Sequence, residues 1–197
     1  MALILKSILQ VYNRGRYSVL TGVVDWWRER KGVQFCTLFF AWLLVLAGLF
    51  ELTRALLVEL YMYPISYVAA WILSSMGINA YLGETLLASG VCQLAVSDIL
   101  YLVTFECTGI FALFMCAASV LAYPASKMSK IKGISLVVPA FLAYSTLRLV
   151  VMGLVARFIP DQIELFHVYI MVLVNIGFVL LLWLYWVREI VPPREVV

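Results

Sequence analysis

The sequence predicts an all-α polytopic membrane protein with about four to six transmembrane helices. Hydrophobic residues make up 65% of the chain, charged residues make up 13%, and the mean hydropathy is +1.03. Soluble domains carry about 25% charged residues, so this composition excludes an ordinary soluble domain. The apolar residues fall into long runs, and a run of about 20 apolar residues crosses a bilayer as a helix. The 197 residues are too few for two such domains, so we expect one.

The N-terminal part predicts a basic surface segment followed by one span. Residues 1–33 alternate apolar patches with six Lys and Arg residues and contain a pair of adjacent tryptophans. This pattern is typical of an amphipathic segment at the membrane surface, with the tryptophans at the level of the headgroups. Residues 34–57 form the first predicted span.

Residues 61–105 predict a short interfacial helix and then a small extracytoplasmic β-hairpin. The apolar stretch 61–76 is shorter than the length that crosses a bilayer. Residues 77–105 are punctuated by glycine and polar side chains, and β-character is strongest in the sequence LYLVTF. An alternative interpretation places two further spans in residues 61–105.

The second half of the chain contains the remaining predicted spans. Three apolar runs predict membrane helices: residues 110–123, 134–156 and 167–187. Loops at 124–133 and 157–166 separate them, and residues 191–197 form a tail. Residues 34–190 are therefore expected to form a single transmembrane domain.

The basic residues predict the orientation. If the N-terminus, the 124–133 loop and the C-terminus share one side, that side holds eleven of the fourteen Lys and Arg residues. Only Arg54, Arg148 and Arg157 remain for the rest of the chain. By the positive-inside rule the side with eleven is cytoplasmic. We expect a multi-pass protein of the cytoplasmic (inner) membrane with its N-terminus in the cytoplasm.

Several classes of site are not expected. The four cysteines form no CxxC pair, so a zinc site and a disulfide framework are not predicted. The chain has one histidine, so a His-rich metal site and a haem site are not predicted either. We therefore expect no cofactor. No basic stripe with interleaved aromatics is present, so nucleic acid is not an expected partner.

Three reactive side chains converge at the predicted outer leaflet: Cys107, Arg148 and His167. Arg148 lies about 12 Å below the outer end of its helix at 1.5 Å per residue. A charge at that depth costs about 2.5–3.5 kcal/mol, which an anionic partner or a developing oxyanion would offset. A histidine near the thiol would complete a Cys–His nucleophile pair.

The residues around Cys107 favour a nucleophilic role. Cys107 stands where a strand meets a helix, and a helix N-terminus favours the thiolate. Thr108 is a candidate cap, and Gly109 lets a substrate backbone approach closely. Glu106 opposes thiolate formation unless it points away or pairs with arginine.

A structural interpretation stands beside each of these roles. Cys36, Cys92 and Cys116 are expected to be packing residues. His167 at a helix entrance is compatible with simple interfacial solvation. Arg148 is alternatively a structural partner of Glu51 or Glu164.

The sequence resembles the exosortase/archaeosortase family of membrane-embedded cysteine transpeptidases over roughly residues 60–190. The resemblance lies in the sequence FECTGI, then LRLVV, then FH, which supply Cys107-Thr108-Gly109, Arg148 and His167 in that order. The short length and the ECTGI sequence are similar to the exosortase H-type branch. Many members carry Asn one turn before the arginine, where this chain has Ser145.

The resemblance implies an enzyme that cleaves C-terminal sorting signals of secreted proteins through an acyl-enzyme on Cys107. The implied substrates end in a short motif, a transmembrane helix and a basic cluster, and lipids surround the site. The acceptor of the acyl group is not predicted. The alternative is a non-enzymatic membrane protein, a small transporter or an assembly factor, that uses Arg148 to bind an anionic ligand. No inverted repeat favours the transporter.

Overall fold

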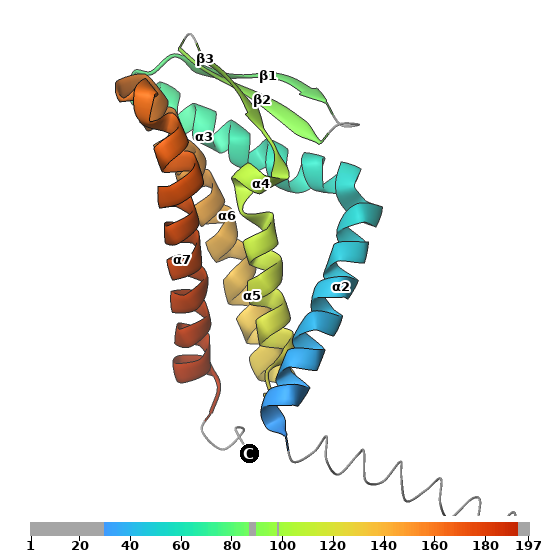
Figure 1. Ribbon diagram of the computed structural model, residues 1–197. Coiled ribbons are helices and arrows are strands. Elements are labelled where there is room, and N and C mark those ends of the chain that lie inside the picture. The colour runs from blue at the N-terminus through green and yellow to red at the C-terminus, as the bar shows by residue number, and fades with distance from the viewer. Residues whose placement is uncertain (1–29, 87–89, 98, 193–197) are drawn as a thin grey trace, which may run out of the picture.

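The computed structural model describes residues 30–86, 90–97 and 99–192 of the chain. Four helices run side by side between the two ends of the molecule, and a small sheet covers one end (Figure 1): α2 (Lys31–Leu57), α5 (Ile110–Ala122), α6 (Lys127–Phe158) and α7 (Met171–Tyr185). The predicted surface segment falls almost entirely on residues 1–29, which lie outside the described residues. The predicted tail at 191–197 lies mostly outside them as well.

One helical run carries the chain from α2 to the sheet. A π-helical segment, η1 (Val58–Met62), joins α2 to α3 (Tyr63–Ser75), and α3 lies across the end of the bundle beneath the strands (Figure 1). Proline is tolerated in the first turn of a helix, so Pro64 does not interrupt this run. The prediction of a short helix at 61–76 is confirmed, although it continues from α2 without a loop.

The segment before Cys107 forms an antiparallel sheet of three strands: β1 (Ala80–Leu86), β2 (Val91–Val96) and β3 (Ile99–Val103). The register pairs Leu94 with Tyr101 and Cys92 with Val103. The expected β-structure is confirmed, with one strand more than a hairpin. The alternative of two spans in residues 61–105 is wrong, because β1, β2 and β3 lie in this segment and pair with one another above α3.

The expected number of spans was too high. Among the described residues three helical runs are long and apolar enough to cross a membrane: Lys31–Ser75, Lys127–Phe158 and Leu165–Ile190. The predicted span at 110–123 is a helix of 13 residues, α5. At 1.5 Å per residue its length is about 20 Å, which is less than the bilayer core of about 30 Å.

The predicted loop at 124–133 is also wrong for most of its length. Ser126 caps α6, since its Oγ accepts a hydrogen bond from the Ser129 backbone N–H at 3.2 Å. Such a cap satisfies one of the free N–H groups of the first turn and fixes the helix start at Lys127. The three lysines of this stretch therefore belong to the first two turns of α6.

Candidate functional site

A tight connection between the sheet and the bundle places Cys107. After β3 the chain makes a single helical turn, α4 (Phe105–Thr108), and enters α5 through Gly109. Gly109 has a φ of +75°, which glycine adopts at little cost because it has no Cβ. The prediction that Cys107 stands where a strand meets a helix is confirmed.

Cys107 and His167 face each other across the site. Their Sγ and Nε2 atoms are 4.0 Å apart although the residues are 60 positions apart in sequence. Thr104 adds its hydroxyl at 3.5 Å from the same sulfur. His167 belongs to η3 (Leu165–Ile170), a π-helical segment of the kind that often occurs at functional sites. Distances between catalytic groups are commonly long without substrate, so this spacing suits a nucleophile and its base.

Arg148 lies next to this pair. An added Cβ on Gly109 would be 3.6 Å from its Nη1 atom, so the guanidinium is close to the turn that carries Cys107. Its charge also acts electrostatically on His167. Arg148 is only 6% exposed, and its Nε atom has no hydrogen-bond partner within the described part of the chain. The structural pairing of Arg148 with Glu51 or Glu164 is not formed.

Ser145 and Tyr61 hold the backbone next to the thiol. The Ser145 hydroxyl donates to the Thr108 carbonyl at 2.6 Å, and the Tyr61 hydroxyl lies 2.8 Å from Ser145 Oγ and donates to the same carbonyl at 3.3 Å. Ser145, which stands where many members of the resembled family carry Asn, therefore supports the Cys107 turn. Sequence reasoning missed Tyr61, because an aromatic residue in an apolar stretch gives no signal of a distant contact.

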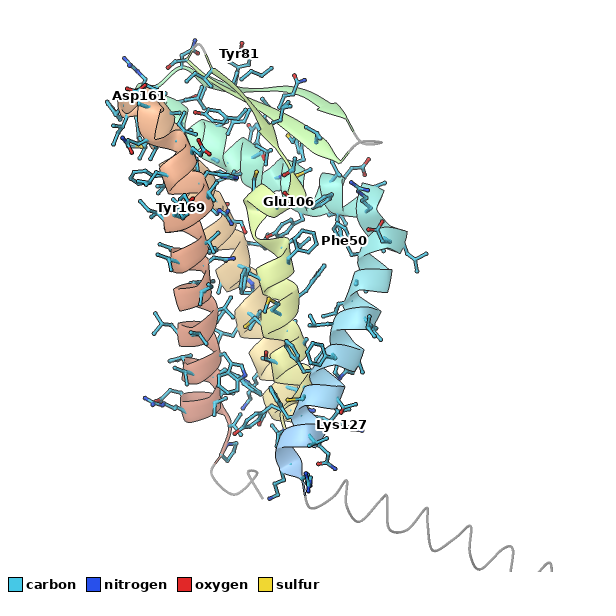
Figure 2. The ribbon with its side chains drawn as sticks, viewed as in Figure 1. Phe50, Tyr81, Glu106, Lys127, Asp161 and Tyr169 are labelled. Atoms are coloured by element: carbon cyan, nitrogen blue, oxygen red, sulfur yellow. The ribbon has the colours of Figure 1, made fainter. Side chains whose placement is uncertain are left out.

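Thr108 does not have the capping role that we expected, and Glu106 is exposed beside a groove. The Thr108 hydroxyl is buried and donates to the Phe105 carbonyl at 2.7 Å, so it does not cap a helix. The exposed Glu106 borders a groove of about 320 Å³ between α2 and α4, together with Glu51 and Arg54. Figure 2 shows Glu106 and Phe50 at the end of the bundle beneath the sheet.

A small cavity of about 50 Å³ borders both Cys107 and His167. Residues of β2, β3 and α6 form its other walls: Leu94, Tyr101, Leu102, Val103, Leu149, Met152 and Gly153. The Tyr101 hydroxyl is buried and has no hydrogen-bond partner among the residues described. Burial raises the pKa of Tyr101, so this phenol remains a protonated donor at neutral pH.

Asn175 of α7 is a second polar residue that sequence reasoning missed. Its Oδ1 atom would also lie 3.6 Å from a Cβ on Gly109, and it has no partner within the described residues. A single asparagine in an apolar run is visible in the sequence, but nothing there indicates that it reaches the Gly109 turn.

The arrangement combines a thiol, an imidazole and a buried guanidinium at one end of the bundle. Such a set can form an acyl-thioester and stabilise the negative charge that develops on its carbonyl oxygen. No three His, Cys, Asp or Glu side chains gather as a metal site in the described part of the chain. Comparison of the chain with known protein families, with characterised proteins and with solved structures finds no match. The functional assignment therefore depends on the residues and their geometry.

Proposed function

We propose that this chain is a membrane-embedded cysteine peptidase or transpeptidase of the exosortase type. It cleaves the C-terminal sorting signals of secreted proteins through an acyl-enzyme on Cys107. The observation that carries the proposal is the approach of Cys107 Sγ to His167 Nε2 at 4.0 Å across 60 positions of sequence. A thiol is activated when an adjacent base takes its proton, and imidazole titrates near neutrality.

Arg148 supplies the charge that this chemistry needs. Attack of a thiolate on a peptide carbonyl places a negative charge on the carbonyl oxygen. A buried guanidinium with a free N–H is suited to that charge, since the described residues leave it without a carboxylate partner. In this role Arg148 interacts more strongly with the transition state than with the substrate, which is the condition for catalysis.

The site faces the extracytoplasmic side in this proposal. The start of α2, the connection between α5 and α6 and the end of α7 lie at the end of the bundle opposite the sheet (Figure 1). These segments, together with η4 (Trp186–Ile190), which directly follows α7, carry Lys31, the three lysines of early α6 and Arg188. By the positive-inside rule that end is cytoplasmic. The scissile bond of a substrate with a membrane helix then lies just outside the membrane, at the level of Cys107.

The test compares the C-termini of exported proteins in cells that make the wild-type chain or Cys107→Ala. With the wild-type chain we expect exported proteins to lose a C-terminal hydrophobic helix and the basic cluster that follows. With Cys107→Ala these tails are retained, because no other group in the site can form the thioester. Mass spectrometry of C-terminal peptides measures the difference.

Cys116→Ala is the matched control, because Cys116 is fully buried in α5 and belongs to a different apolar cluster from Cys107. It leaves processing close to that of the wild-type chain. Identical C-termini in the wild-type and Cys107→Ala cells would show that Cys107 is not the nucleophile. The alternative function, binding of an anionic ligand by the buried Arg148, would then be favoured.

A further inference from the structure

The strand that leads to Cys107 lies at an edge of the sheet. The strand order is β1-β2-β3, so β3 pairs with β2 on one side and with no described strand on the other. Thr104 directly follows β3, and its hydroxyl lies 3.5 Å from Cys107 Sγ. The free edge of β3 therefore runs along the chain up to the thiol.

The register shows which backbone groups face this free edge. The Ser97 N–H donates to the Asn79 carbonyl at 2.7 Å, so the odd-numbered residues of the adjoining β2 direct their backbone groups towards β1. Because this direction alternates along an antiparallel ladder, the even-numbered residues of β2 bond β3. Their partners there are Ile99, Tyr101 and Val103. Leu100 and Leu102 consequently direct their N–H and carbonyl groups to the free edge.

The two edges of the sheet differ in a way that leaves only the β3 edge regular. The pairing of β1 shifts in register between Leu82 and Thr85, as at a bulge, whereas β3 pairs with β2 without a break. Bulges and charged side chains are common means of preventing another chain from adding to an edge. β3 has neither, since its sequence is ILYLV. Its Leu100 and Leu102 side chains are 56% and 59% exposed, so the described part of the chain does not cover them.

The cavity beside Cys107 lies at the end of this edge. Its volume is about 50 Å³, and Leu102 and Val103 of β3 border it together with Cys107 and His167. This small volume suits one peptide group of an extended chain. A chain laid along β3 would therefore place a single carbonyl beside the thiol and the imidazole.

We propose that the substrate binds as an additional strand on the free edge of β3. An added strand gains its affinity from main-chain hydrogen bonds, which here come from Leu100 and Leu102. The ligand class is an extended segment with an N–H at the positions that donate to β3, which excludes proline there. This inference rests on the proposed function and specifies how its substrate is held.

The direction of the added strand follows from the position of the site. β3 runs towards the bundle and ends at α4 (Figure 1). In the proposed function the membrane helix of the substrate follows the scissile bond and lies on the side of the bundle. The residues before the scissile bond therefore lie on the side of the sheet and run parallel to β3 until they reach Cys107.

Leu100→Pro tests the backbone contact, because it removes an outward N–H without taking a donor from the ladder between β2 and β3. The measurement is the C-termini of exported proteins in cells that make each variant. We expect processing about tenfold slower than with the wild-type chain or with Leu100→Ala, which keeps the N–H. Alkylation of Cys107 by iodoacetamide, measured on the detergent-solubilised full chain, is expected to change less than threefold.

A second pair of variants blocks the edge without a proline. Leu100→Lys places a charge on the open edge, as natural edge strands do. Tyr81→Lys is the matched control, because Tyr81, Ala95 and Leu100 form one row across the sheet. Tyr81 is 57% exposed, close to the value for Leu100, and lies on the opposite edge strand. We expect Leu100→Lys to slow processing at least threefold and Tyr81→Lys to leave it unchanged.

The outcomes separate this inference from the proposed function. Slow processing in Leu100→Pro and Leu100→Lys, with normal alkylation of Cys107 and normal thermal midpoints, supports the inference. If Leu100→Pro lowers the thermal midpoint, the comparison of Leu100→Lys with Tyr81→Lys decides. Normal processing in Leu100→Lys and in a folded Leu100→Pro overturns the inference and leaves the nucleophile in place.

Three further results contradict the inference. Equal losses in Leu100→Ala and Leu100→Pro would mean that the side chain is recognised and not the backbone. A dimer of the wild-type chain in size exclusion that Leu100→Pro dissociates would mean that the edge pairs with a second copy. Identical C-termini in wild-type and Cys107→Ala cells overturn the proposed function and the inference together.

Discussion

At the scale of single residues, Arg148 carries a buried charge, because the residue is only 6% exposed. No carboxylate partner lies in the described parts of the chain. A charge inside a membrane protein costs about 2.5–3.5 kcal/mol on insertion scales. Its guanidinium lies near the Gly109 turn, and its charge acts on His167. The residue is therefore placed to act on whatever binds at Cys107.

Arg148→Lys tests whether the shape of the guanidinium matters. Arginine presents a planar fork of five donors, whereas lysine presents a point charge. If Arg148 donates to an oxyanion, Arg148→Lys and Arg148→Ala both lower the rate of processing by about 10²–10³-fold. The rate is measured at matched protein levels, with size exclusion in detergent as the check on folding.

Arg157→Lys is the control for this substitution, because Arg157 is exposed near the end of the same helix. It is expected to leave the rate unchanged. Near wild-type turnover in Arg148→Lys would show that a positive charge alone suffices, which contradicts the oxyanion role.

The Thr108 carbonyl has two side-chain donors, Ser145 and Tyr61, and we expect them to substitute for each other. Tyr61→Phe or Ser145→Ala alone removes one donor and lowers stability by about 0.5–1.5 kcal/mol. The double variant leaves the Thr108 carbonyl without either donor. Its loss of stability therefore exceeds the sum of the losses in the two single variants. Thermal midpoints in detergent form the double-mutant cycle.

Tyr67→Phe serves as the control for Tyr61→Phe, because Tyr67 is exposed on α3. Strict additivity in the cycle would mean that the two hydroxyls do not share the Thr108 carbonyl.

At the scale of elements, two π-helical segments carry residues of the site. Tyr61 belongs to η1 and His167 to η3. A π turn inserts one extra residue per turn and rotates the side chains that follow. An ideal α-helix through these positions would direct the two side chains elsewhere, so the local winding of the helices is part of what assembles the site.

The packing of η4 (Trp186–Ile190), the π-helical turn that follows α7, on α6 depends on Gly133. An added Cβ there would lie 2.5 Å from Trp186 Nε1 and 2.8 Å from Val120 Cγ1. Trp186 is fully buried and donates to the Ser129 carbonyl at 2.9 Å, so it cannot move aside without losing that bond. We expect Gly133→Ala to destabilise the protein by about 1–3 kcal/mol through overpacking. The lowered thermal midpoint in detergent is the measurement.

Gly177→Ala in α7 is the control, because a Cβ at Gly177 has no neighbour within 4 Å. It is expected to raise stability by about 0.5–1 kcal/mol, since alanine has the higher helix propensity. A neutral Gly133→Ala would mean that Trp186 has room to repack.

At the scale of the whole molecule, the two ends of the bundle differ in charge and in structure. Figure 2 shows Lys127 at one end, and Asp161 at the other near the sheet. Glu106 and Tyr169 mark the level of the site between the sheet and the middle of the bundle (Figure 2). The site therefore lies at the end opposite the lysines of α6.

The orientation is tested with single cysteines introduced into a chain whose four native cysteines are serine. Asp161→Cys and Lys132→Cys place exposed thiols at the two ends. In intact cells a membrane-impermeant thiol reagent is expected to label Asp161→Cys at once, and Lys132→Cys only after permeabilisation. The reverse pattern would place the site on the cytoplasmic side and exclude secreted substrates.

The sequence by itself determined the class of the protein and the order of its main elements. Apolar runs and β-propensity depend on local composition, so the helices, the β-structure before Cys107 and the position of Cys107 at a strand-to-helix junction were predictable. The start of α6 was missed because the lysines suggested a loop, while Ser126 set the cap. The number of spans was overestimated because the apolar run at 110–123 was counted as a span, although its helix of 13 residues is shorter than the bilayer core.

The convergence of Cys107, Arg148 and His167 was expected from the predicted topology, but only the tertiary structure decided which of their atoms meet and at what distance. The 4.0 Å approach of Cys107 to His167, the absence of an acidic partner for Arg148 in the described residues, and the Tyr61 contact with Thr108 join distant segments. Such contacts depend on how α3, α6 and α7 pack and on the two π turns, and periodicity along the chain does not encode them. The cavity at Tyr101 likewise exists only where the sheet meets the bundle.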